Sequence, residues 1–198
     1  MSDSTFDTFI HNLLRDYWRL HPVQATQSGV HDYDDRLPDL SADGQGERRA
    51  WRASQAAALR GFDDADLDAT QRLDKRVALA HLALYDIQDD WGYARRAPAF
   101  YVEQALNGLH ALLARPAAQA DLSPGPSPEK GGELRPSSPP SLVGKGDGGL
   151  GSLDPLLARL QAIPTLLGQA RAGLDPQLVA PEFLEIGRVA VRGAVGFI

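Results

Sequence analysis

The chain has 198 residues, of which 43% are hydrophobic and 23% are charged, and 20 Lys and Arg against 26 Asp and Glu give a formal net charge of -6. This composition is typical of one soluble globular domain or of part of a larger one, and the absence of cysteine excludes disulfides and thiolate metal sites. Because the basic residues are scattered through an acidic chain, we expect no nucleic-acid partner.

The N-terminal residues carry no targeting signal. Polar residues follow Met1, and Asp7, Arg15 and Asp16 interrupt the apolar pattern that comes next. A signal peptide and a membrane span both need an uninterrupted apolar run, so we expect neither. The sequence therefore predicts a cytoplasmic protein with no membrane partner.

Apolar residues at steps of three and four predict a first helix that starts after Ser4 and stops before Pro22, since proline disfavours helical geometry at the residue before it. A short helical turn is predicted over 22–27 and is closed by Gly29. A polar loop over 31–39 should follow.

Two longer helices are predicted next. The first runs over 41–59 and has a thin apolar stripe with several alanines. The second runs over 68–91, and its apolar residues alternate in steps of four and three, a spacing that suits antiparallel packing. The residues of this stripe are Leu73, Val77, Ala80, Leu84, Ile87 and Trp91.

Three further helices are predicted over 98–115, 154–170 and 181–197, again from apolar periodicity and from a proline near each start. No segment alternates apolar and polar residues for long enough to predict a strand. We therefore expect an all-α fold, an antiparallel bundle-like array of about six or seven helices interrupted by one disordered linker.

Residues 121–151 differ from the rest of the chain, because Gly, Pro and Ser make up 19 of these 31 residues. So few apolar side chains do not offset the entropy of ordering the segment, and we interpret it as a disordered insertion. It would divide an N-terminal helical part over 4–120 from its continuation, in the same helical domain, over 152–198.

The chain ends inside the apolar pattern of its last helix, without the polar residues that usually close a domain, so we expect a truncated domain. The apolar face of that helix should contact either a missing C-terminal half or a second copy. The residues of this face are Phe183, Ile186, Ala190 and Phe197.

The residues give little evidence of chemistry, and we assign no catalytic, cofactor-binding or metal-binding residue. No two of the five histidines have the spacing of a helical metal site. His81, with Tyr85 four residues later, is a weak catalytic candidate, and a hydrogen-bonded histidine at the core boundary is the favoured interpretation. Asp86, Asp89 and Asp90 lie near a helix C-terminus, where carboxylates are unfavourable, which hints at a charged partner on another helix; a solvated surface is favoured.

One stretch is distinctive, with the pattern P-x-x-A-T-x-x-G from Pro22 followed by H-D-x-D from His31. It resembles the opening of the bacterial family called domain of unknown function 885. Further agreement comes from Leu73-Asp74, from Pro98 and Tyr101, and from Arg159-Leu160 with Ile163-Pro164. The resemblance covers 4–120 and 152–198.

The resemblance implies a longer, mostly helical protein that looks like a zinc metallopeptidase, with an H-E-x-x-P-G-H-H motif in its C-terminal half. This sequence has no such motif, so zinc and a peptide substrate are expected only for a form that contains that half. The favoured interpretation of the matched loop positions is a structural role. The second interpretation is that they form the edge of a substrate cleft. They are Ala25, Thr26, Gly29, His31, Asp32 and Asp34.

Three functions stay open at this point. The first is the N-terminal helical portion of a zinc peptidase, inactive as this chain alone. The second is a stand-alone helical module for binding or dimerisation. The third, and the least favoured, is a metal-free hydrolase that uses His81 with the acidic residues at 86–90.

Overall fold

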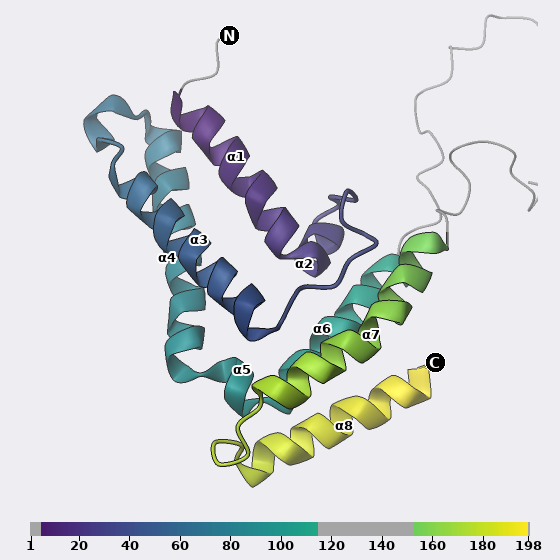
Figure 1. Cartoon of the computed structure of the whole chain (residues 1–198). Coiled ribbons are helices and arrows are strands. Elements are labelled where there is room, and N and C mark those ends of the chain that lie inside the picture. The colour runs from purple at the N-terminus through teal and green to yellow at the C-terminus, as the bar shows by residue number, and fades with distance from the viewer. Residues whose placement is uncertain (1–4, 115–152, 198) are drawn as a thin grey trace, which may run out of the picture.

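The computed structural model describes residues 5–114 and 153–197, and every regular element in these ranges is helical (Figure 1). The predicted all-α class is confirmed, and a one-turn helix, α5, is added to the predicted ones. The predicted linker at 121–151 lies outside the described residues. The elements are α1 (Thr5–Leu20), α2 (Pro22–Gln27), α3 (Ala42–Arg60), the 3-10 helix η1 (Asp64–Asp66), α4 (Ala69–Trp91), α5 (Tyr93–Arg96), α6 (Pro98–Leu113), α7 (Asp154–Gly173) and α8 (Pro181–Phe197).

Local sequence sets where the two longest N-terminal helices begin. The Ser41 hydroxyl accepts a 3.1 Å hydrogen bond from the backbone N–H of Gly44 and caps α3. Asp68 and Gln71 form a reciprocal capping box at the start of α4. Each cap satisfies backbone donors that the first turn of a helix leaves unpaired.

Helices α1, α3 and α4 share one apolar core, in which α4 lies behind α3 in the view of Figure 1. Phe6 and Phe62 meet edge to face with ring centroids 5.1 Å apart and close the end of this core. Burial of these side chains supplies the main stabilisation of this half of the chain. The buried residues are Phe6, Leu13, Ala56, Leu59, Leu67 and Leu82.

Helix α6 packs against both α7 and α8 and carries the second core. Tyr101, in the first turn of α6, is fully buried in this core, beside Leu166 and Ala170 of α7 and Leu40 of the loop before α3. At Gly173 of α7 a Cβ atom would lie 2.6 Å from the Tyr101 hydroxyl oxygen, so only glycine fits there without a shift. Residues from both sides of 121–151 therefore share one core.

The short helix α5 joins the group of α1, α3 and α4 to the group of α6, α7 and α8. Arg95 on this helix pairs with Asp175, in the connection between α7 and α8, at 2.7 Å, and the Asp175 backbone N–H donates to the Arg95 carbonyl at 3.0 Å. The Trp91 ring at the end of α4 also contacts Phe183 of α8, with centroids 5.8 Å apart. The α7–α8 connection is thereby held against the end of α4.

The apolar stripe of α4 does not pack as its spacing predicts. Leu82 is the one residue that α4 buries fully, with Ala78 and Leu79 partly buried beside it. The predicted stripe lies on the opposite side and stays exposed, from Leu73 to Trp91. The α1–α3–α4 core is small enough for one short row of α4 residues to fill it.

The apolar face of α8 is divided between a contact and solvent. Gly187 is buried against Pro98 of α6, and Phe183 and Ala190 on the same side are half-buried. Ile186 is 52% exposed, and the Phe197 side chain lies outside the described residues. The predicted face is thus partly used within the chain, and its exposed part is a row that includes Ile186 and Val189.

Candidate functional site

The Thr26 side chain lies at the centre of the distinctive loop. Thr26 projects from α2, and its hydroxyl is 2.6 Å from the Asp34 carboxylate, to which it donates. The other Asp34 oxygen lies 3.1 Å from His31 Nδ1. Thr26 and Asp34 are buried, whereas His31 is exposed. The two halves of the sequence motif are therefore joined by a buried hydrogen bond.

Arg159 of α7 closes the loop from the other side and has no exposed surface. Its Nη2 donates to the Thr26 hydroxyl at 2.6 Å, and Nε donates to the Arg36 carbonyl at 2.9 Å. Nη1 donates to the carbonyl of Gly108 on α6 at 2.5 Å. Since a guanidinium is costly to bury unless its donors are satisfied, this set of acceptors holds α2, the loop, α6 and α7 together.

The remaining motif residues fit the same local geometry. Ala25 of α2 is fully buried, and Gly29 adopts a φ of 81°, a left-handed conformation that favours glycine after a helix. Asp32 is exposed at the tip of the loop. The structure thus places Ala25, Thr26, Gly29 and Asp34 where the loop is built, and leaves His31 and Asp32 at its surface.

A second cluster brings together two tyrosines and two histidines from α1, α4 and the α1–α2 junction. The Tyr17 and Tyr85 hydroxyls are 3.0 Å apart, and the Tyr17 and His21 rings stack with centroids 4.3 Å apart. His81 lies 5.3 Å from both tyrosine rings, measured between centroids. His81 and Tyr85, the two weak candidates, are therefore neighbours, but His81 itself is exposed.

Burial shifts the pKa of the two buried residues of this cluster, His21 and Tyr17. Burial lowers the pKa of His21 to about 4, against a hydrogen bond from its Nδ1 to the Tyr17 carbonyl that acts in the opposite direction. Burial, together with the hydrogen bond to Tyr85, raises the pKa of Tyr17 well above its usual range. Both groups are neutral near pH 7. A neutral stack of this kind fits a packing role.

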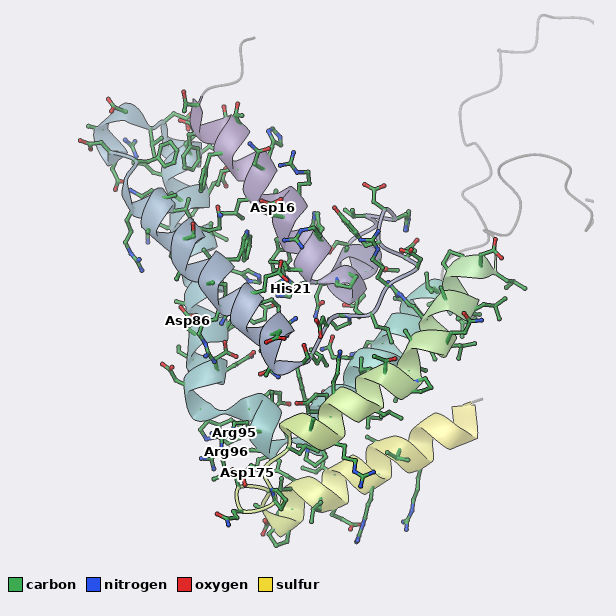
Figure 2. All side chains as sticks on the ribbon, viewed as in Figure 1. Asp16, His21, Asp86, Arg95, Arg96 and Asp175 are labelled. Atoms are coloured by element: carbon green, nitrogen blue, oxygen red, sulfur yellow. The ribbon has the colours of Figure 1, made fainter. Side chains whose placement is uncertain are left out.

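The acidic residues near the end of α4 have a charged partner on another helix, Arg52 of α3. Its side chain is only 3% exposed, and Nε lies 3.0 Å from Asp86, while Nη2 binds Asp89. Arg49 reaches the same Asp89 oxygen at 3.6 Å. Figure 2 shows Asp86 on α4 and His21 at the junction of α1 and α2. The favoured expectation of a solvated surface is wrong for Asp89, which is mostly buried in this pairing, and holds for the exposed Asp90.

A small cavity that is partly open to solvent lies beside this ion pair. Arg48 lines it from α3 and also donates to the Asp39 carbonyl. The walls include His21, Tyr85 and Phe100. The cavity has polar and aromatic walls, and the Asp89 carboxylate lines it beside its partner Arg52.

Sequence reasoning missed the buried roles of His21, Arg48 and Arg52. The signal for Arg52 was present, since it precedes Ala56 and Leu59 at the same four- and three-residue steps that define the buried face of α3. A charged residue on such a face predicts a buried ion pair. His21 carried no comparable signal because a histidine before Pro22 is also ordinary in a loop.

Within 5–114 and 153–197, no three His, Cys, Asp or Glu side chains gather as they would around a metal ion. In the whole sequence, none of the five histidines is followed by glutamate. The described residues therefore do not fit a zinc site. Among the described helices, none has both the length and the apolar composition that crossing a bilayer requires.

Comparison with known proteins gives one match. Residues 22–195 match the family model described as "Bacterial protein of unknown function (DUF885)". The match begins at Pro22, the first residue of the distinctive motif, and extends to α8. No curated protein and no solved structure matches the chain.

Proposed function

The chain belongs to the DUF885 family of bacterial proteins, and from that membership we propose that it is a helical, non-catalytic portion of a zinc-peptidase-like hydrolase. The observation that carries the proposal is the use of the buried polar groups: Arg159 ties α7 to the loop, and Arg52 ties α3 to α4. Both groups are guanidiniums that donate to acceptors within the chain, so they stabilise a scaffold and supply neither a nucleophile nor a base. The family membership itself leaves the activity open.

The exposed apolar faces support the same proposal. Large apolar side chains of α8, among them Ile186 and Val189, are more than half exposed. An exposed apolar row of this kind marks a surface that another folded part covers. We propose that further helices of the same longer protein cover this row and supply the catalytic groups.

An assay with zinc and a peptide mixture tests the missing activity. We expect the purified chain to release no new peptides, by mass spectrometry, above a heat-denatured sample of the same chain. Cleavage that a zinc chelator abolishes would contradict the proposal. The DNA beyond codon 198, read in all frames, provides the second test, and an H-E-x-x-P-G-H-H motif there would support it.

A stand-alone module for binding or dimerisation is the second candidate, and the exposed row of α8 favours it too. Substitution of Ile186 and Val189 by Glu should lower the binding of an apolar dye without lowering the melting temperature, while Arg192→Glu on the polar side of α8 serves as the matched control. A dimer of defined stoichiometry that dissociates when Ile186 and Val189 are substituted would favour the stand-alone module. Disordered aggregation would favour the portion of a larger protein.

A further inference from the structure

The exposed stripe of α4 is the longest apolar row on the described surface. Its five large residues are between 46% and 66% exposed, and they run along a helix of 23 residues. They are Leu73, Val77, Leu84, Ile87 and Trp91. A row this long on one helix face indicates an interaction surface, since single exposed apolar residues are common but contiguous rows are not.

The spacing of the stripe is that of a helix-pairing seam. With Ala80 included, the steps are four, three, four, three and four, which is a heptad pattern. Ala80 and Ala83 near the middle are small and exposed, so a second helix could approach closely there. The occupant of this seam is therefore a helix with a matching row.

We propose that the α4 seam binds the α4 seam of a second copy of this chain, in antiparallel orientation. Centred on position 82, the pairing places Leu73 opposite the partner's Trp91, and Val77 opposite the partner's Ile87. Ala80 then lies opposite the partner's Leu84. Each layer joins two residues of the row, and the two ends of the seam are equivalent, as a two-fold axis requires.

The charges beside the seam select this orientation. Arg76 and Asp90 are exposed, lie two heptads apart, and each precedes a seam residue, so both lie along the same edge. An antiparallel pair brings like edges together, and Arg76 meets the partner's Asp90 twice in the dimer. A parallel pair would bring Arg76 to the partner's His81 and leave Asp90 without a counterpart on α4. The charged edge of the seam is therefore self-complementary only in the antiparallel pair.

This inference does not depend on the proposed hydrolase portion, which concerns α8 and the catalytic groups. The α4 seam faces away from the core that α1 and α3 cover, and its last residue, Trp91, also contacts Phe183 of α8. A further helix on α8 would leave the seam free along most of its length. A result that contradicts one proposal therefore does not contradict the other.

Charge exchange tests both the partner and the orientation. We expect analytical ultracentrifugation over a concentration series to show a monomer–dimer equilibrium for the full chain. Arg76→Asp alone, or Asp90→Arg alone, should weaken dimerisation by about tenfold, because each converts two ion pairs into two like-charge contacts. The double variant should regain the affinity, and an equimolar mixture of the two single variants should form heterodimers.

Two controls separate the seam from general effects. Ile87→Glu should abolish the dimer, whereas Leu157→Glu, at a similarly exposed apolar position of α7, should not. Arg171→Asp, an exposed arginine of α7, should leave the affinity unchanged. All variants should keep the melting temperature of the monomer. A chain that stays monomeric, or a dimer that neither single exchange weakens, overturns the proposal.

Discussion

The Thr26 hydroxyl and the Arg159 guanidinium are joined by a 2.6 Å hydrogen bond, although 133 positions separate them in the sequence. Thr26 also donates to Asp34, so one hydroxyl satisfies a buried cation and a buried carboxylate. Neither charged group is exposed, and each would be costly to bury alone. The motif residue Thr26 is thus the link through which α7 fixes the loop.

Thr26→Val should destabilise the fold by about 1–3 kcal/mol, because the isosteric side chain leaves the Arg159 and Asp34 groups without their shared partner. Urea unfolding followed by circular dichroism measures the difference. Thr165→Val, on the exposed side of α7, is the matched control and should change the free energy of unfolding by a few tenths of a kcal/mol at most. Equal effects of the two substitutions would contradict the role of Thr26.

Arg159→Met should cost about 3 kcal/mol, since it removes the donors that bind the Arg36 and Gly108 carbonyls and the Thr26 hydroxyl. Arg159→Lys should recover only part of this loss, because an ammonium has three donors and lacks the planar fork. The melting temperatures of both variants provide the measurement. Arg171→Met, on the exposed face of the same helix, should melt like the parent chain.

Stability should fall as the pH drops from about 6.5 to about 4, because His21 is buried as the neutral form. Its pKa is lowered to about 4 in the folded chain, so the unfolded chain binds more protons across this window. The stabilisation is fully present above the unfolded pKa and amounts to roughly 3 kcal/mol. His21→Asn, which keeps a side-chain donor, should flatten the slope of unfolding free energy against pH, whereas His11→Asn at an exposed position should not.

Gly173→Ala should destabilise the chain by about 1–3 kcal/mol, because the new Cβ would lie 2.6 Å from the Tyr101 hydroxyl oxygen. Removal of that oxygen should relieve the conflict. In a Tyr101→Phe background, Gly173→Ala should therefore be neutral, or slightly stabilising through its better helix propensity. A double-mutant cycle by chemical unfolding measures this coupling, and an additive result would show that the contact is not the cause.

Sequence patterns predicted the helices well, because each long helix carries apolar residues at its own period and a cap or proline near its start. They failed on how α4 packs. Its heptad row is real, but the α1 and α3 side chains meet α4 on the row of Leu82, which the pattern did not favour. Periodicity gives the faces of a helix that can pack, and only tertiary contacts decide which one is covered.

The candidate site was predicted less completely. The distinctive motif includes Thr26 and Asp34, and Asp86 and Asp89 hinted at a charged partner, but the pairing of Thr26 with Arg159 was not predicted. Long-range pairs of this kind depend on how helices far apart in the chain come together. In a single sequence, the one local sign of such a pairing is a charged residue on an otherwise apolar helix face, and this sign does not identify the partner.

Because Arg159 comes late in the chain, it is synthesised well after the loop residues that it binds. During synthesis at about 5–20 residues per second, the ribosome adds the 133 positions between Thr26 and Arg159 over roughly 7 to 27 seconds. Through that interval the loop after α2 has its carbonyls and its carboxylate in place but no guanidinium to join them. The first helices therefore emerge into the cell before the residue that locks them, and this stretch is the period in which a chaperone or a protease would meet the open loop.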